Sequence, residues 1–583
     1  MPAGNVFLPE DDRTELLARC KQLIEACKVS QGQRAALARQ QFAITETGKG
    51  DGSRSRINLL YGFLDNLASH LFSPTALKFA VGFQKLYPKN ILQRGVEAAR
   101  ILSDDWEQTN TDLLFGQGVF EALRYGTCIL KQWAQEEGED RHAAYHSALV
   151  MPWNFGVTNE KDNSLDRQDA MCETVILTLP EVWRRIYHLP NAEQLFRKIQ
   201  AQSKRGESGD DNNSFFHPVW STSQISTGID SMTRPIPGGI VALSNNPNYS
   251  IIGPTLGVDV VKMYELWIRN GADYACVQII EPDIMISPTQ YTRLSNLLIS
   301  GAEHTNLHPY TRICANETPG WFWGRSELTD LIEPQNLVST WADDATRLLG
   351  LQTDKILAFI GDDGLNDEAY DAFRAAGYRS MPQGASVTDI TPHFPPEMLP
   401  MLQFAMGLVN RVGGFDNILG GQGQPGVRSS EQGEMLKQLA SPRLLDRSLL
   451  LERQCAQAAD LRLSLREAKD ADHYWTDGTT EKTIEETRFT LKELPTDRRV
   501  TVDSHSGSPI FRNRHEQLLA FMLKAGILDG PEFIELSEVQ HKDILVQRLK
   551  DRMAEQSAFM KQLAQQQPEV FAKLIENQGS RKR

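Results

Sequence analysis

The sequence predicts a mainly α-helical protein with small β modules, which is an α+β fold. Apolar residues recur at three- and four-residue steps over several long stretches, the pattern of one-sided helices. Glycine and proline separate these stretches from shorter strand-like runs. At 583 residues the chain can bury large cores and form several subdomains. Its 23% charged and 40% hydrophobic residues are the balance of an ordered globular protein.

The N-terminal third is predicted to combine helices with strands. Helices are expected at residues 10–45, 56–71 and 92–125, and Gly126 should end the last of them. Thr178 and Glu181 have the spacing of a capping box that opens a further helix. Strand-like runs lie between these helices, at residues 127–133, 148–152 and 170–179.

A β-hairpin is the clearest local prediction. Residues 258–269 and 272–281 are strand-like runs joined at Asn270-Gly271, the preferred dipeptide of a type I′ turn. Side chains alternate along a strand, so Tyr264 and Trp267 should lie on opposite faces. The preceding polar residues 203–257 predict a long loop that is functional or partly disordered.

A helix is predicted within residues 319–351, near the middle of the chain. Ser326 is the expected N-cap, because acidic residues that favour a helix N-terminus follow it directly. Pro334 should break or kink the helix and open its second segment. Gly350 should end it. A short strand is expected next, at residues 355–360.

The C-terminal part is predicted to be mostly helical. Helices are expected at residues 366–377, 396–411, 429–468 (bent at Pro442) and 544–577. The remaining segments are predicted to be extended at 378–395, a glycine-rich loop at 413–426, and strands at 487–491 and 499–503.

The charge and the cysteines limit the possible functions. The formal net charge is −14, which argues against tight sequence-specific reading of nucleic acid. The seven cysteines are scattered without a CxxC pair, which favours free thiols in a reducing compartment. No apolar run is long enough to span a bilayer, and the N-terminus lacks the apolar core of a signal peptide.

No catalytic or metal motif accompanies these elements. The phosphate-binding loop, the nucleophile elbow, the zinc helix H-E-x-x-H and the dinucleotide-binding G-x-G-x-x-G turn are all missing. Asp343 and Asp344 are neighbours on a predicted helix, so their side chains point in different directions and make poor joint ligands. We therefore expect no catalytic residues, no metal and no cofactor.

Several motifs resemble those of portal proteins, the head-to-tail connectors of tailed bacteriophages, with podophage-like features. The strongest is PGWFWGRSELTD, in which Gly324 and Ser326 match the G-x-S start of the portal stem helix. RYGTCIL and MPWNFGV are similar to the end of the wing helix and the strand that follows it. GVRSSEQGEMLK and SGSPIFRNRHEQ match later family positions, although the usual Ser-Gly pair is displaced in the former.

The resemblance implies a division of the chain into the parts of a portal protomer. Residues 1–179 would form the wing, 258–323 the clip and 324–351 the stem helix. Residues 180–257 would hold a wing or stem helix and a flexible polar loop. The rest would comprise the tunnel-loop region with its strand and kinked helix at 352–428, wing or crown elements at 429–505, and a helical crown at 506–583.

The resemblance also implies a function and a set of partners. A dodecameric ring at one capsid vertex would conduct double-stranded DNA during packaging and ejection, without reading its sequence. The ring would dock the large terminase subunit, then adaptor or tail proteins, and would contact the major capsid and scaffolding proteins. It would be located in the virion, and in the host cytoplasm during assembly, with no membrane partner.

Two groups of residues are candidates for these contacts. The candidates for the DNA channel and tunnel loop are Arg347, Lys355, Arg374, Arg379 and Gln383. The candidates for docking partners at the clip are Tyr264, Trp267, Arg269, Asn270 and Tyr274. The alternatives to a portal are another capsid-associated adaptor or tail component, or an α+β enzyme whose site has no recognisable motif.

Overall fold

The computed structural model describes most of the chain between residues 13 and 503. The described residues are 13–48, 57–74, 77–137, 142–187, 191–205, 259–270, 273–281, 284–287, 308–353, 357–360, 386–390, 392, 395–413, 442–469, 472–474, 488–491, 494–495, 497–503 and 521–524. The chain divides into two compact units, Met1–Leu71 with Phe79–Val502, and Phe72–Lys78 with Asp503–Arg583. Nearly all described elements belong to the first unit. The helices predicted at 366–377 and 544–577 lie outside the described residues.

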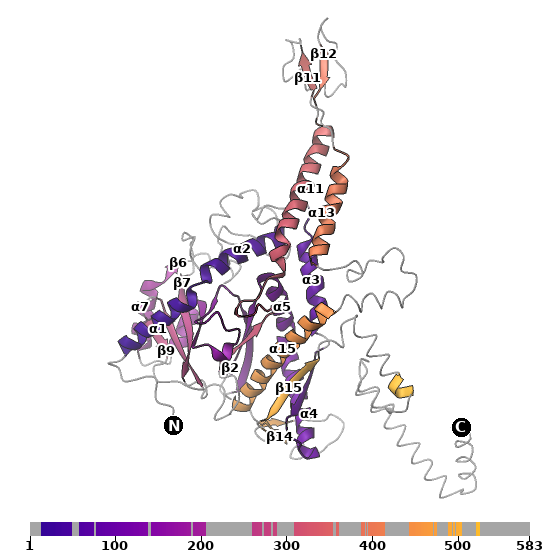
Figure 1. Ribbon diagram of the computed structural model, residues 1–583. Helices are drawn as coiled ribbons and strands as arrows, with labels where there is room; N and C mark the ends of the chain where they lie inside the picture. The colour runs from indigo at the N-terminus through magenta and orange to yellow at the C-terminus, as the bar shows by residue number, and fades with distance from the viewer. Residues whose placement is uncertain are drawn as a thin grey trace, which may run out of the picture. The chain divides into compact units, whose positions relative to one another are not determined.

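The described elements mix helix with sheet, which confirms the predicted α+β class (Figure 1). Two of the helices predicted in the N-terminal third are each divided into two helices in the structure, so the prediction of single helices is wrong. In place of one helix at 10–45 there are α1 (Arg13–Lys28) and α2 (Gln31–Thr47). In place of one helix at 92–125 there are α4 (Lys89–Gln108) and α5 (Thr111–Tyr125). Asn110 breaks the second pair because it has φ 51°, a left-handed conformation that asparagine tolerates.

Other predictions for this part of the chain are confirmed. Helix α3 (Leu60–Leu71) lies within the predicted 56–71. Gly126 ends α5 with φ 90°. Thr178 caps α6 (Leu179–Ile186), because its backbone N–H donates to the Glu181 carboxylate at 2.8 Å as the capping box requires. Helix α7 (Ala192–Gln202) packs beside α6.

Six strands form the largest sheet. Their order is β4 (Phe155–Val157), β5 (Ala170–Thr178), β7 (Asp259–Asn270), β8 (Asp273–Ile280) and β9 (Ile284–Ser287), with β6 (Lys204–Arg205) also paired to β7. The hairpin of β7 and β8 was predicted, but Asn270 pairs with Asp273 and so lies in the ladder rather than inside the turn. Strand β5 runs antiparallel to β7 along its whole length.

The side chains of β7 alternate between the two faces of the sheet, as predicted, and different elements pack against each face. Tyr264, Leu266 and Ile268 face helix α1, which buries Cys20, Ile24 and Cys27 against them. On the opposite face, Val261 and Met263 pack under α6 and α7 through Val182, Ile186 and Ile199. Trp267, also on that opposite face, joins a core with Ile129, Tyr310 and Phe322.

A second sheet contributes residues to the core that contains Trp267. It consists of β2 (Cys128–Glu137) between β3 (His142–Val150) and β10 (Tyr310–Ile313). Helix α15 (Pro442–Lys469) packs against β2, β10, α3 and α4. Pro442 is the first residue of α15, where its missing N–H costs nothing. The predicted residues 429–441 of this tract lie outside the described residues.

Three two-stranded ribbons complete the first unit. Strand β1 (Lys78–Phe83) pairs with β15 (Arg498–Asp503), and β13 (Asp472–Tyr474) pairs with β14 (Arg488–Thr490). Strand β11 (Leu357–Ile360) pairs with β12 (Ser386–Asp389). Of the described helices, none is long and apolar enough to cross a membrane.

Candidate functional site

Two helices from the second half of the chain form an antiparallel pair, which we call the helical hairpin. Helix α11 (Ile332–Thr353) and helix α13 (Met398–Gly413) pack side by side along their length (Figure 1). The β11–β12 ribbon lies in sequence between the end of α11 and the start of α13. Helix α13 confirms the helix predicted at residues 396–411. Gly350 does not end α11, which continues through Thr353.

The start of α11 is built in two steps. A short 3₁₀-helix, η5 (Glu327–Asp330), comes first, and Leu331 separates it from α11. Ser326 caps η5 as predicted, since its Oγ accepts a hydrogen bond from the Leu328 N–H at 3.1 Å. The break expected at Pro334 falls at Leu331 instead. Pro334 is the third residue of α11, where no intrahelical N–H bond is required of it.

Two glycines from distant motifs meet at this start. The Gly324 N–H donates to Thr127 Oγ1 at 2.8 Å. A Cβ added at Gly324 would lie 2.2 Å from the Cys314 sulfur and 2.3 Å from the Gly126 carbonyl oxygen. A Cβ at Gly126 would in turn lie 2.1 Å from the Gly324 carbonyl oxygen. The structure therefore brings the RYGT turn and the GRS motif into backbone contact, and both positions require glycine.

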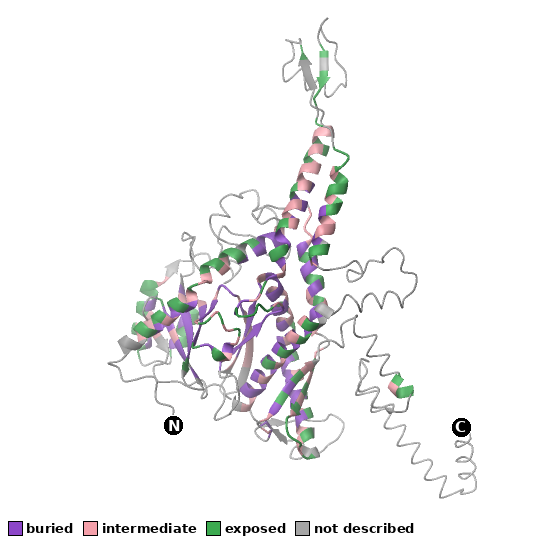
Figure 2. Ribbon diagram, viewed as in Figure 1, coloured by how far each residue is buried: buried purple, intermediate pink, exposed green. Residues whose placement is uncertain are grey.

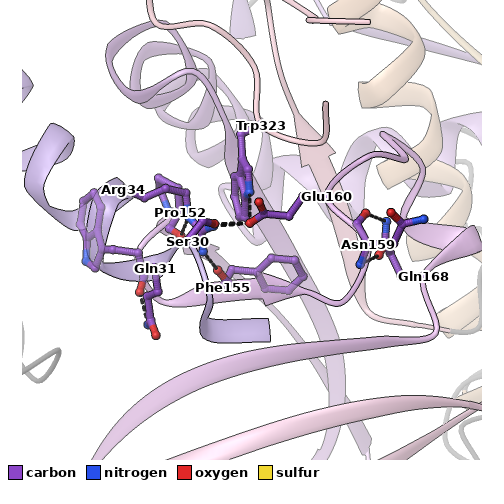
Figure 3. Close-up of polar contacts among 10 residues, drawn as sticks. Ser30, Gln31, Arg34, Pro152, Phe155, Asn159, Glu160, Gln168 and Trp323 are labelled. Atoms are coloured by element: carbon purple, nitrogen blue, oxygen red, sulfur yellow. Dashed lines mark hydrogen bonds and ion pairs between the residues drawn. The ribbon is translucent and has the colours of Figure 1, made fainter. Parts of the chain in front are cut away.

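A set of polar contacts, which we call the Arg34 anchor, holds the aromatic approach to α11. It consists of Ser30, Arg34, Glu160 and Trp323 (Figure 3). Glu160 Oε1 accepts from Arg34 Nη1 and from Trp323 Nε1, each at 2.9 Å, and it also bonds the Ser30 hydroxyl. The Arg34 guanidinium lies 3.7 Å from the Trp323 ring centroid. Burial lowers the pKa of Arg34 to about 10, although Glu160 opposes that shift.

The remaining donors of Arg34 bind backbone carbonyls. Its Nε donates to Pro152 at 2.9 Å and its Nη2 donates to Phe155 at 2.7 Å. In the same view, the buried Gln168 side chain exchanges two hydrogen bonds of 2.9 Å with the Asn159 backbone (Figure 3). The anchor thus ties the α1–α2 junction, the β4 region and the approach to α11 to one another.

The first half of α11 is fixed by buried polar side chains. Gln335 Nε2 donates to the Ile57 carbonyl at 2.8 Å, and its Oε1 accepts from the Leu59 N–H at 3.2 Å. Ser339 Oγ donates to the Gly48 carbonyl at 2.8 Å. Because both side chains are fully buried, these bonds set the position of the helix relative to the α2–α3 segment.

The second half of the hairpin is different, because its described residues are mostly intermediate or exposed (Figure 2), and several of them are large and apolar. In α11, no residue described between 343 and 352 is buried. We call the exposed apolar residues of the ribbon and α13 the distal apolar surface. Its members are Ile360, Ile390, Leu399, Met401 and Phe404, each between 49% and 60% exposed. At 100° per residue, Leu399 and Phe404 lie on different sides of α13, so the apolar surface is not confined to one face.

The predicted DNA-channel residues are only partly described. Arg347 is exposed on α11, with its Nη2 3.9 Å from Asp344 Oδ1. The other four lie outside the described residues, namely Lys355, Arg374, Arg379 and Gln383.

Three of the predicted docking residues are inside the fold. Tyr264, Trp267 and Tyr274 are each 4% exposed. The Tyr264 hydroxyl bonds Lys28 Nζ at 2.7 Å, and the Tyr274 hydroxyl donates to the Gln168 carbonyl at 2.8 Å. These side chains fill the sheet core, so they are not presented to a partner in this conformation. Arg269 is exposed, and Asn270 is the last paired residue of β7.

Trp267 belongs to a buried ionic cluster that was not predicted from the sequence. Glu173 and Glu265 lie directly opposite each other on β5 and β7. Lys131 from β2 reaches both carboxylates, Glu173 at 2.7 Å and Glu265 at 2.9 Å. The Tyr310 hydroxyl donates to Glu173 at 2.8 Å, and Trp267 Nε1 donates to Glu265 at 3.0 Å. A glutamate within each of two apolar strands was the signal that could have revealed the cluster.

Burial acts to raise the pKa of both carboxyl groups, but their net pKa shifts have opposite directions. It raises the pKa of Glu173, and the Lys131 ammonium only partly offsets that shift. Burial also acts to raise the pKa of Glu265, but Lys131 and the hydrogen bonds to it and to Trp267 outweigh burial, so the net shift is downward. The cluster joins the two sheets, because Lys131 of the three-stranded sheet pairs with Glu173 and Glu265 of the six-stranded sheet. We treat it as structural rather than catalytic.

Comparison with known proteins adds no assignment. No protein-family model matches the chain, and no curated protein is significantly similar to it. Among the residues that the structure describes, no group of three histidine, cysteine or acidic side chains could hold a metal ion. The helical hairpin, with its fixed base and its distal apolar surface, is accordingly the strongest candidate for a functional element.

Proposed function

We propose that this chain is the protomer of a portal-type ring, which conducts double-stranded DNA into and out of a viral capsid. The ring is dodecameric and occupies one capsid vertex in the assembled virion. The observation that carries the proposal is the distal apolar surface of the helical hairpin. Phe404 is 60% exposed and Leu399 is 56% exposed, on two sides of α13, which packs against α11, the helix whose base is held by buried contacts.

In the proposed ring, neighbouring copies of the chain cover the exposed apolar side chains of the hairpin. Apolar side chains of this size gain about 1.5–3 kcal/mol each when they are fully removed from water. A hairpin flanked by the equivalent hairpins of two other copies can cover both sides, and a head-to-tail contact of this kind closes into a ring when its rotation allows. The order of elements supports the same proposal, because a G-x-S motif, a helix, a strand and a later helix follow one another as in the portal family.

The DNA-facing role follows from the same arrangement. Arg347 lies on α11 of the hairpin and reaches solvent with a side chain that is 75% exposed. In the proposed ring it contacts phosphates weakly, together with Lys355, Arg374, Arg379 and Gln383 from the adjoining segments. An overall charge of −14 suits a channel that does not retain DNA. The force for packaging comes from the terminase, which docks on the ring before the adaptor and tail proteins.

Electron microscopy of the purified full-length chain tests the proposal. Negatively stained particles should be rings of about twelve subunits with an open centre, and mass photometry should give a matching mass. A compact single copy at every protein concentration would rule the proposal out. A six-fold or tubular form would favour a different capsid-associated component, and a small globular oligomer would favour an enzyme.

A further inference from the structure

A short segment of the chain carries a charge opposite to that of the whole protein. Residues 179–205 contain six basic and two acidic side chains, a net charge of +4, whereas the complete chain has −14. The basic residues are Arg184, Arg185, Arg197, Lys198, Lys204 and Arg205. A local reversal of charge of this size indicates a surface with a polyanionic partner.

The fold exposes three of these basic side chains on the outer sides of α6 and α7. Helices α6 and α7 pack on the six-stranded sheet through Val182, Ile186 and Ile199, which are fully buried. Their opposite sides expose Arg184, Arg197 and Lys198. None of these three makes an ion pair within the part of the chain that the structure describes. Arg185 differs, because its Nη1 lies 3.8 Å from the Met263 sulfur and its charge lowers the pKa of Glu265 from the sheet side.

Aromatic side chains lie among these cations. Trp183 of α6 is 39% exposed, and Tyr187, the C-cap residue of α6, is 65% exposed about one helical turn later. Phe196 of α7 holds the Trp183 ring edge-on, with the ring centroids 5.2 Å apart and an interplanar angle of 73°. The Trp183 ring is thus fixed in orientation while more than a third of its side chain remains accessible. We call Trp183, Arg184, Tyr187, Arg197 and Lys198 the α6–α7 surface.

We propose that the α6–α7 surface binds single-stranded nucleic acid. Arg184, Arg197 and Lys198 contact successive phosphates, and unpaired bases stack on Trp183 and Tyr187. The exposed rings favour a single strand over a duplex, whose bases are already stacked on one another. They favour nucleic acid over an acidic peptide, because a carboxylate-rich segment offers charge to the cations but no flat face to the rings. This activity is separate from the proposed ring and does not require it.

Fluorescence anisotropy with a labelled oligothymidylate of twenty nucleotides tests the proposal on the full-length protein. Removing the cations in the triple variant Arg184→Ala, Arg197→Ala and Lys198→Ala should weaken binding at least tenfold. It should also reduce the slope of log K against log salt by about 2, since each phosphate contact on a single strand contributes about 0.7. Trp183→Ala should weaken binding roughly tenfold with an unchanged salt slope.

A second triple variant, Arg19→Ala, Lys161→Ala and Arg453→Ala, is the matched control. It removes the same charge from exposed positions on other elements and should leave the affinity within about twofold of the wild type. The proposal fails if the wild-type protein does not bind the oligonucleotide at low salt, or if both triple variants weaken binding equally. Tighter binding to a duplex of the same length, or to a polyglutamate peptide, would also overturn it.

Discussion

At the scale of single residues, Lys131 lies between two carboxylates that face each other across adjacent strands. Like charges directly opposite in an antiparallel pair are destabilising. Here they come from Glu173 and Glu265, and the ammonium from the second sheet compensates for them. A buried charge set of this kind contributes little net stability when complete, but losing one partner is costly. The cluster therefore specifies how the two sheets meet more than it stabilises them.

Lys131→Met should destabilise the protein by about 3 kcal/mol at pH 7, because two buried carboxylates would lose their cation. The loss should be smaller at pH 5, where those carboxylates take up protons more readily in the variant. Urea unfolding followed by tryptophan fluorescence at the two pH values measures both effects. An equal loss of unfolding free energy at both pH values would mean that the lysine charge does not affect the protonation of the two carboxylates.

Glu173→Gln should make the stability of the protein less sensitive to rising pH, whereas Lys131→Met should make it more sensitive. The raised pKa of Glu173 means that its folded form binds a proton more tightly than its unfolded form. Its contribution is therefore full below the unfolded pKa and is lost as pH rises through the folded pKa. The variant should lack that loss and cost less than about 1 kcal/mol at pH 7, as a neutral amide still bonds Lys131 and Tyr310. An unaltered stability–pH curve would contradict this assignment.

At the scale of elements, the helical hairpin combines a fixed base with an exposed end. Its predicted helices were correct in type because the apolar spacing of residues 332–353 and 398–413 is a local property. Its anchoring was not predictable in the same way. Arg34 and Trp323 are far apart in sequence, and neither position has a pattern that signals their contact through Glu160.

The two glycines of the α11 region make a matched test. Gly324→Ala should destabilise the first unit by more than about 3 kcal/mol, since its Cβ would overlap the Cys314 sulfur and the Gly126 carbonyl. Gly350→Ala should stabilise it by about 0.5–1 kcal/mol, because nothing lies within 4 Å of the added Cβ and α11 is helical there. Thermal unfolding monitored by circular dichroism measures both. Similar effects of the two changes would argue against the close backbone contact at Gly324.

A single substitution in α13 tests whether the distal apolar surface forms contacts between copies of the chain. Phe404→Glu should leave the protomer folded, because that side chain is 60% exposed, but should reduce the ring population at least tenfold. Gln403→Glu adds the same charge at the neighbouring exposed position of α13 and is the control. Mass photometry across a dilution series measures the effect. Rings of unchanged stability in the Phe404 variant would place the intersubunit contact elsewhere on the chain.

At the scale of the whole molecule, all seven cysteines are buried and free. Burial raises the pKa of Cys20 to about 11 and that of Cys27 to about 12, and it raises the pKa of the other five as well. The native protein should therefore react with fewer than about one thiol equivalent of a colorimetric disulfide reagent at pH 8 within minutes. Denaturant should release all seven. Fast labelling of the native chain would show that part of it opens readily.

The sequence predicted the strands of this molecule better than their partners. The faces of β7 were correct because alternation is a local property, and the apolar residues there occupy both faces of a sheet covered on two sides. The pairing of β5 with β7, and of β10 with β2, was not foreseen. As a result, Tyr264, Trp267 and Tyr274 were predicted as docking residues, whereas they are buried in a sheet that also contains β4 and β5. Long-range pairing has no local sequence signal, and the glutamates that accompany it were overlooked.

The pairing of β5 with β7 has a consequence for synthesis on the ribosome. Strand β5 leaves the exit tunnel while its partner, more than eighty residues later in the chain, is still untranslated. At a translation rate of about 5–20 residues per second, its open edge waits for several seconds. Strand β2 waits longer still for β10. Nascent chains stalled before residue 259 should therefore be prone to aggregation and should need a chaperone that shields unpaired strand edges.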